Sequence, residues 1–316
     1  MTPTPGGAPV TVETFAAAPP GIRVVTVDSG TPGPVLTLIA GVHGNELAGI
    51  LVLRQLCADP PRLLRGRLRI LPVAHEAAFD ADMRESPLDG KNLAREFPGD
   101  SAGTATERIA HLIDTRVIEG SDYLLDLHTS SPDADMPFFA GCLDDGVSPE
   151  CAAAVALCEA FGTGIVWTHP EVGPGRTLTS AHARGIPAAY VESPEGGRLT
   201  DELVTRYREG VMRVLGSLGV IAAEDTPTAV PCDLRLHGNG DIDRARAAEH
   251  DGLFVAVRAL LDAVEPGELI GYVVDAAGVR CEEYRAGVSG VITTLRRRGR
   301  VRRGDVLGEL GEVREP

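Results

Sequence analysis

The regular alternation of short apolar runs with helical patterns is the strongest constraint on how this chain can fold. Each apolar run has the length of one buried strand, and each helical segment is long enough to cross back over a sheet. In chain order we predict a strand at 33–40, a helix at 47–57, a strand at 67–74, a helix at 106–118 with a threonine cap and Glu107 in its first turn, a strand at 121–129, a helix at 149–161, a strand at 164–167, a helix at 179–185, a strand at 186–192 and a helix at 199–219. Strands interleaved with helices predict an α/β fold whose sheet is covered on both faces.

The pattern changes near Thr226, where a Thr-Pro-Thr segment follows the last long helix. Beyond it the apolar runs are short and interrupted by glycines, which is typical of an all-β unit. We therefore predict two domains, an α/β domain at 1–225 and a small β domain at 226–316, joined by a linker near 224–231.

Charge and composition exclude several partners and chemistries. The net charge of −15 argues against a nucleic-acid partner, because phosphate binding requires clustered Lys and Arg. One run of arginines, at 296–303, lies among β-forming residues and predicts the solvated face of a hairpin. Lys91 is the only lysine, and its context DGKN fits no Schiff-base, phosphate-loop or carrier motif.

Nothing in the sequence predicts a membrane partner or export. The N-terminal residues lack the basic and apolar regions of a secretory signal, and no apolar run approaches the roughly 18 residues that span a bilayer. The six cysteines include no C-x-x-C pair and are expected to be reduced. We expect a cytoplasmic protein, and the sequence leaves open whether it forms a homo-oligomer.

Two predicted strands end in residues that can bind a metal. His43 and Glu46 follow the strand at 33–40, and His128 ends the strand at 121–129 with Asp126 two residues before it. Carboxyl ends of parallel strands share one edge of a sheet, and a close pair plus one distant ligand is common for catalytic zinc. Asp126 could orient a ligand. Alternatively, Asp126 and His128 form only a hydrogen-bonded pair, and His43 caps the following helix.

A hydrolytic metal site also needs a base and a positive group near the reacting carbonyl. The strand at 186–192 ends in Glu192, our candidate base, and Glu195 is a second candidate. Arg84 and Arg95 lie in a turn-rich loop and could polarise a carbonyl or hold a substrate carboxylate. The alternative is that both form surface ion pairs.

Four motifs occur in an order that identifies a family. GVHGNELAG, NLAREFPG, LLDLHT and AAYVESPEGG resemble the succinylglutamate desuccinylase and aspartoacylase family over roughly residues 35–310. The resemblance implies a zinc-carboxypeptidase-like mixed sheet with helices on both faces, followed by a small barrel-like β domain. The stretch SPLDGKNLAREFPGD particularly resembles the bacterial branch of N-acyl amino acid deacylases, which includes the deacetylase of ectoine breakdown.

The resemblance also implies roles for individual residues. His43, Glu46 and His128 match the ligands of one Zn²⁺ per chain. Glu192 matches the residue that activates water and then protonates the leaving amine, and Arg95 matches the arginine near the scissile carbonyl.

Arg84 and Asn92 match residues at the substrate, with one departure from the family nearby. The family usually has Asn-Leu-Asn-Arg where this chain has Asn92-Leu-Ala-Arg95, so Ala94 lacks the second amide. Arg176 is a candidate replacement or a further substrate contact.

These observations together predict a zinc-dependent amidohydrolase that removes an acyl group from a small N-acylated amino acid or related amide. Two alternatives stay open at this point. A metallocarboxypeptidase would use the same zinc set on peptides, and a non-catalytic homologue would bind zinc or a ligand without turnover.

Overall fold

A computed structural model describes residues 9–16, 21–194 and 196–314. The strands are β1 (Val10–Phe15), β2 (Ile22–Asp28), β3 (Val35–Ala40), β4 (Arg67–Leu71), β5 (Tyr123–Leu127), β6 (Ala134–Asp135), β7 (Phe139–Leu143), β8 (Ile165–His169), β9 (Ala188–Glu192), β10 (Leu234–His237), β11 (Arg246–Ala247), β12 (Gly252–Ala256), β13 (Ala263–Val264), β14 (Leu269–Val274), β15 (Arg280–Arg285), β16 (Gly290–Arg296), β17 (Arg300–Val301) and β18 (Val306–Val313). The α-helices are α1 (Leu47–Ala58), α2 (Glu76–Asp80), α3 (Ala105–Ile113), α4 (Pro149–Phe161), α5 (Thr177–His182) and α6 (Asp201–Ser217). Short turns of other helix types are η1 (Leu93–Arg95), η2 (Asp114–Ile118), η3 (Ala223–Asp225) and η4 (Ile242–Arg244).

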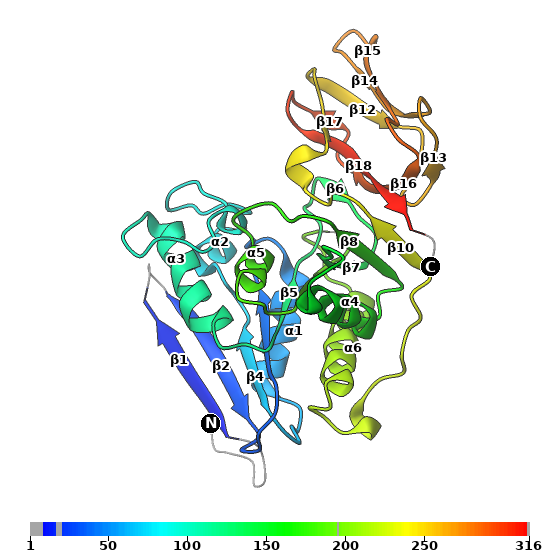
Figure 1. The fold of residues 1–316 in the computed structure, drawn as a ribbon. Coiled ribbons are helices and arrows are strands. Elements are labelled where there is room, and N and C mark those ends of the chain that lie inside the picture. The colour runs from blue at the N-terminus through cyan, green and yellow to red at the C-terminus, as the bar shows by residue number, and fades with distance from the viewer. Residues whose placement is uncertain (1–8, 17–20, 195, 315–316) are drawn as a thin grey trace.

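A large mixed sheet forms the centre of the molecule (Figure 1). Four parallel strands lie side by side in the order β4, β3, β5 and β9. The antiparallel pair β1–β2 extends the β4 edge, and β7 pairs antiparallel with β9 on the other side. The sequence analysis did not single out β1, β2 or β7. The predicted mixed sheet is confirmed.

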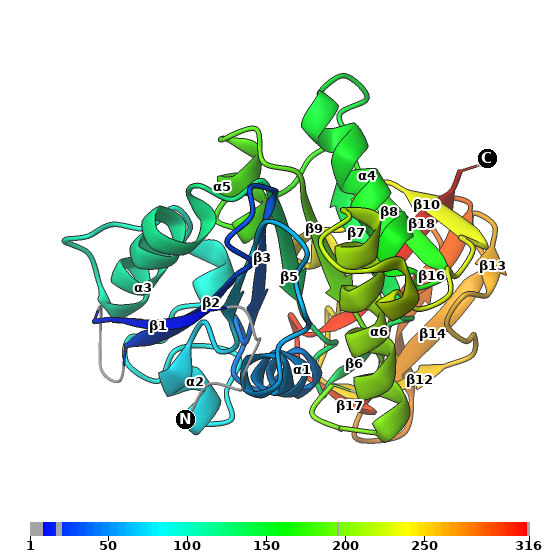
Figure 2. The ribbon, with the colours of Figure 1, turned by 90° about the horizontal axis from the view of Figure 1, so that it is seen from below.

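Helices cover both faces of this sheet (Figure 2). Helices α1, α4 and α6 pack on one face, in a core that includes Leu38 and Leu125. Helices α3 and α5, with η2, pack on the other face, in a core that includes Ile39 and Leu124. Neighbouring residues of one strand thus enter different cores, as the alternation of side chains along a strand requires.

The helix predicted at 106–118 begins one residue earlier, at Ala105, and is not uniform. Its N-cap is Thr104, in a capping box with Glu107, whose carboxylate accepts the Thr104 backbone N–H at 2.6 Å. The α-helix ends at Ile113, and a π-helical turn, η2, completes the predicted span.

The C-terminal strands continue the large sheet instead of forming an isolated unit. Strand β10 pairs parallel with β8 and antiparallel with β18, and β16 and β13 follow. Strands β15, β14, β12 and β17 form a second, antiparallel sheet, which shares one buried core with β13, β16 and β18 of the large sheet. The predicted division at 225–226 falls between η3 and β10, and it remains a prediction. Within the described ranges, no helix is both long and apolar enough to cross a membrane.

The arginine run at 296–303 connects β16 to β17. Arg297 and Arg298 form ion pairs with Asp135 and Asp133, which lie at β6. Strand β17 pairs with β12 and not with β16, so the run joins the two sheets and does not form a β16–β17 hairpin. Because β6 pairs with β16, these contacts tie the C-terminal strands to the segment that follows β5.

Helix α1 packs closely on β5, and this contact fixes the position of the first turn of α1 relative to the end of β5. A Cβ added to Gly49 would lie 2.8 Å from Leu127 Cβ and 2.9 Å from Leu127 O. We therefore predict that Gly49→Val lowers the free energy of unfolding by about 1–3 kcal/mol, measured by urea denaturation. The control is Gly287→Val, because a Cβ there would meet no atom within 4 Å. Equal stability of the two variants would contradict this packing.

Candidate metal centre and the cavity around it

The turn between β3 and α1 carries two of the predicted ligands. A Cβ at Gly44 would collide with the backbone of Ala78 in α2, so this turn needs a glycine to lie against that helix. Glu46 is the N-cap of α1 in an extended conformation, and its side chain makes no capping hydrogen bond. Its carboxylate is therefore available to turn back toward His43.

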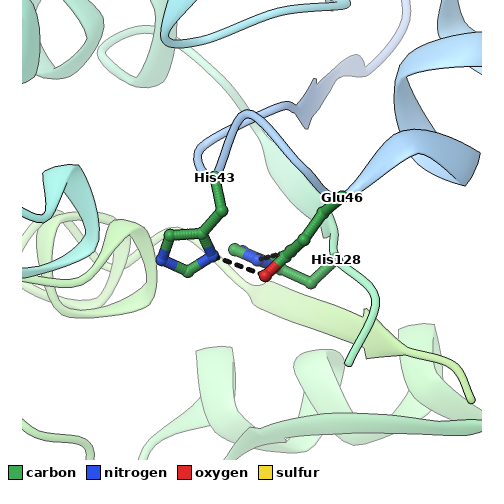
Figure 3. A group of neighbouring side chains, drawn as sticks. All are labelled: His43, Glu46 and His128. Atoms are coloured by element: carbon green, nitrogen blue, oxygen red, sulfur yellow. Dashed lines mark hydrogen bonds and ion pairs between the residues drawn. The ribbon is translucent and has the colours of Figure 1, made fainter. Parts of the chain in front are cut away.

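The three predicted ligands meet at one point (Figure 3). Glu46 Oε1 lies 2.7 Å from His43 Nδ1, and Glu46 Oε2 lies 2.8 Å from His128 Nδ1. Candidate ligand atoms of the three residues all lie within 4.8 Å of one another, and all three are buried. His43 therefore does not cap the following helix. Two imidazole nitrogens and one carboxylate are the donor set of a catalytic zinc site, so the residues fit this metal.

Neighbouring side chains orient both imidazole rings. His43 Nε2 lies 3.1 Å from Asn92 Oδ1, and His128 Nε2 lies 3.1 Å from Asp126 Oδ2. Both partners are hydrogen-bond acceptors, so each Nε2 carries a proton and each Nδ1 faces Glu46. Thr177 at the start of α5 donates to Asp126 at 2.6 Å and holds that carboxylate. Such outer contacts raise the affinity of a metal for histidine ligands.

Electrostatics favours a cation between these side chains. Burial, with the charge of Arg84 added, lowers the pKa of His43 to about 4, so this imidazole is neutral and can act as a ligand. Burial also acts to lower the pKa of His128, but the carboxylates of Asp126 and Glu46 outweigh it and hold that pKa well above its usual range. The environment of His128 thus stabilises positive charge at the ring, whether a proton or a metal supplies it.

Glu192 ends β9, beside β5, and faces the same cavity as the ligands. The residue is half-buried, and its Oε2 is shielded from solvent with no hydrogen-bond partner in the described structure. Burial, followed by the charge of Glu46, raises the pKa of Glu192 to about 8. A carboxyl with such a pKa can both accept and release a proton near neutral pH. The second candidate, Glu195, lies outside the described residues.

Arg84 lies directly against the ligands. Its Nη1 is 3.0 Å from Glu46 Oε1 and 3.2 Å from His43 Nδ1. Asn92, predicted at the substrate, contacts His43 and also accepts the backbone N–H of Ala94 at 2.9 Å. The substrate contacts of Arg84 and Asn92 remain predictions, while their positions give them a role in shaping the metal centre.

Arg95 and Arg176 both line the cavity, and both are paired with acidic residues. Arg95 makes a bidentate pair with Asp243, at 2.7 and 2.9 Å. Arg176 contacts Asp241 at 2.5 Å and Asp243 at 3.3 Å. The two aspartates lie at η4, 148 and 65 residues away along the chain, and the sequence analysis did not identify them. The predicted roles of both arginines at the substrate remain predictions.

The cavity has a volume of about 680 Å³ and is built by both parts of the chain. The ligands and Glu192 lie at one region of its wall, and residues from 240–247 and 296–309 supply another. The segment that carries η4 and the strand β18 therefore narrow the space over the metal centre. A cavity of this kind suits a small molecule better than an extended chain.

The cavity wall away from the ligands contains aromatic rings and one carboxyl without a described hydrogen-bond partner, that of Glu309. Tyr190 donates to His169 Nε2 at 2.8 Å, and His169 Nδ1 donates to the carbonyl of Gly238 at 2.9 Å. His169 is thus a buried histidine with both ring nitrogens hydrogen-bonded. Glu309 on β18 is 9% exposed, and within the described residues its carboxyl accepts no hydrogen bond. Only Tyr190 gave a sequence signal, since it lies two residues before Glu192 on one strand.

Comparisons with known proteins agree with this architecture. The model of the succinylglutamate desuccinylase/aspartoacylase catalytic domain matches residues 32–218. The N-alpha-acetyl-L-2,4-diaminobutyric acid deacetylase of Halomonas elongata is 33% identical over 301 residues, which cover 92% of this chain and 86% of the relative.

Solved structures share the fold over nearly the whole chain. The product-bound ectoine utilization protein EutE of Ruegeria pomeroyi has a TM-score of 0.83 and 26% identity, covering 98% of this chain and 97% of its own. A succinylglutamate desuccinylase from Silicibacter sp. TM1040 has a TM-score of 0.82 and 26% identity, covering 98% and 94%. The similarity therefore includes the C-terminal strands, which the family model does not cover.

The orientation of His43 by Asn92 leads to a prediction about metal affinity. Asn92→Ala removes the acceptor for His43 Nε2–H and should weaken zinc binding by about 10–100-fold, measured by competition with a chelating dye. Asn92→Asp keeps an acceptor at this position, so its zinc affinity should stay close to that of the unaltered protein.

The assignment of His128 as a ligand has a direct test. His128→Ala should no longer bind one zinc per chain, and a variant that still binds it would refute this ligand.

The unpaired Glu309 leads to a prediction about stability. Burial first, and then Asp241, raises the pKa of this carboxyl from 4.5 to about 8. The folded state thus binds the proton more tightly than the unfolded state, so the contribution of Glu309 to stability declines as pH rises from about 4.5 to about 8. Glu309→Gln should therefore be more stable than the unaltered protein at pH 9, on the order of a few kcal/mol, and equal to it at pH 4. Thermal unfolding across this range measures the difference, and a constant difference would contradict the prediction.

Proposed function

Because the chain belongs to the succinylglutamate desuccinylase/aspartoacylase family, we propose that it is a zinc-dependent deacylase acting on a small N-acyl amino acid. The observation that carries this proposal is the convergence of His43, Glu46 and His128 beside the unpaired carboxyl of Glu192. The family match and the name of the Halomonas relative support removal of an acyl group. We also propose that it acts in the cytoplasm, which rests on the sequence alone.

One zinc ion per chain would be held by His43 Nδ1, His128 Nδ1 and the carboxylate of Glu46. Bound there, zinc would supply a Lewis acid for the carbonyl and would lower the pKa of water. Asn92 and Asp126 would fix the two imidazoles in the tautomer that leaves each Nδ1 available.

Glu192 is proposed to move the protons of the reaction. Its carboxylate takes a proton from the attacking water and later gives it to the nitrogen of the leaving amine, so that the amide becomes a carboxylate and a free amine. A pKa raised to about 8 by burial and Glu46 supports both steps, because neither protonation state is strongly disfavoured near neutral pH.

Arginines are proposed to assist at the carbonyl and to position the substrate. We propose that Arg95 stabilises the negative charge that develops on the carbonyl oxygen, and that Arg84, Asn92 and Arg176 contact the substrate. All four line the cavity. The buried Ala94 beside them offers no side-chain hydrogen bond where the family usually has an amide.

The shape of the cavity supports a small substrate over a peptide. Residues 240–247 and β18 line it opposite the sheet edge that carries the ligands, so the C-terminal part of the chain restricts its length. We propose that this restriction separates the protein from carboxypeptidases with a similar zinc set.

Removing the carboxyl of Glu192 tests this function. Glu192→Gln should keep one zinc per chain, measured by elemental analysis, and lower kcat by at least about 10²–10⁴-fold, because proton transfer is lost while the ligands remain. The substrates are N-acetyl, N-succinyl and N-formyl amino acids, including N-α-acetyl-2,4-diaminobutyrate, with a short peptide for comparison.

Glu202→Gln, on the exposed start of α6, is the matched control and should not change kcat. Turnover of the peptide in preference to every N-acyl amino acid would favour the carboxypeptidase function. A zinc-loaded protein that hydrolyses none of these compounds would refute the proposal.

A further inference from the structure

We propose that Glu309 binds a positively charged ammonium group of the substrate, so that the cavity selects N-acyl amino acids carrying a second, free amine. The inference rests on the proposed deacylase function for the acyl group, and it concerns the part of the molecule beyond the family-matched residues 32–218. It makes β18 a source of specificity and not only a cover over the cavity.

The first observation is the charge of the cavity wall. Nine acidic residues line it, namely Glu85, Asp126, Asp133, Glu171, Glu192, Asp241, Asp243, Asp305 and Glu309. The arginines of the wall are four, and each is paired with an acid: Arg84 with Glu46, Arg95 with Asp243, Arg176 with Asp241 and Arg296 with Asp305. Two further acids are paired with arginines outside the wall, Asp133 with Arg298 and Glu171 with Arg244, while Glu192 and Glu309 have no such partner in the described structure. A negatively lined cavity attracts a cation and opposes an additional anion.

The second observation is that Glu309 lacks the partner that its position requires. Glu309 is 9% exposed as a residue, and a carboxyl of such a residue is normally hydrogen-bonded or paired, because burying an unpaired polar group is unfavourable. Within the described residues no donor reaches the Glu309 carboxyl, while Asp241 adds negative charge nearby. The carboxylate form of Glu309 thus has no positive neighbour, and a positive group that enters from the cavity would provide one.

The third observation is the aromatic wall of the same cavity. Phe139, Trp167, His169 and Tyr190 line it and contact one another in sequence, with ring centroids 5.4 Å apart for Phe139 and Trp167 and 5.1 Å apart for Trp167 and His169. Glu309 lies close enough to Tyr190 to contribute to its raised pKa. Aromatic faces beside a carboxylate are a common environment for an organic ammonium group.

Spacing along β9 connects this region to the metal centre. Tyr190 and Glu192 are two residues apart on one strand, so their side chains leave the same face about 7 Å apart. Tyr190, near Glu309, and Glu192, near the ligands, therefore belong to one wall of the cavity.

A metal ion is the less suitable occupant of this acidic region. Among the described residues, His43, Glu46 and His128 form the one group of three or more ligands with atoms within 4.8 Å. Glu309 does not belong to such a group, so it lacks the convergent oxygens that a divalent ion needs. An ammonium group needs only one carboxylate and a suitable surface.

Binding of free amino acids to the zinc-loaded protein tests the inference without turnover. 2,4-Diaminobutyrate and norvaline have the same length and differ in one charged group, so calorimetry compares their affinities directly. We expect the diamino acid to bind about tenfold or more tightly, and Glu309→Gln to abolish the difference. Glu312→Gln, an exposed residue of the same strand, should preserve it. Equal affinities in the unaltered protein would overturn the inference.

Turnover separates failure of this inference from failure of the proposed function. For the N-acetyl derivatives of the same two amino acids, Glu309→Gln should raise KM for the charged substrate about tenfold or more and leave kcat and the neutral substrate unchanged. Hydrolysis of both compounds with no effect of Glu309→Gln would refute the ammonium site and leave the deacylase intact. Hydrolysis of neither, with the binding difference retained, would refute the deacylase and leave the site. Added Mg²⁺ or Zn²⁺ could also compete with 2,4-diaminobutyrate for binding. Competition that occurs in the unaltered protein and is lost in Glu309→Gln would assign the site to a metal and overturn the inference.

Discussion

The carboxylate of Glu46 is the interaction on which the functional architecture depends. It is buried between two imidazoles that follow two different strands, β3 and β5, and burial of its charge is favourable only if positive charge converges on it. His128, Arg84 and a bound metal can each provide that charge. Three features position the partners of this carboxylate: the turn after β3, the close packing of α1 on β5 and the end of β5. A displacement of any of them would leave the buried Glu46 carboxylate without a partner.

Around this centre, burial and neighbouring charges decide which side chains bind a proton. Glu192 lies beside Glu46 with a shielded oxygen, and this raises its affinity for a proton. His43 is kept neutral, while His128 is held between two carboxylates. One carboxyl and two imidazoles thus acquire distinct affinities for a proton within one small region, and the two imidazoles differ from each other. Such separation of pKa values is typical of sites that transfer protons.

The C-terminal strands complete the cavity and change its charge. Asp241 and Asp243 neutralise Arg176 and Arg95, and Glu309 adds a carboxyl without a partner. A family that matches this chain through residues 32–218 can therefore present different cavities, according to what the segments after β10 contribute. Under the proposed function, the metal centre would carry out the reaction, and these later segments would select the molecule that reaches it.

The sequence by itself was enough to predict the α/β fold, and to single out the three candidate metal ligands and the candidate base that the structure brings together. It could do so because strand periodicity is local, and because the ends of parallel strands meet at one edge whatever the details of packing. Only the tertiary structure decided that Asn92 faces His43, that Arg95 and Arg176 are paired, and that Glu309 lines the same cavity as Glu192. These contacts join segments up to 148 residues apart through loop and strand geometry, which leaves no periodic pattern in the sequence.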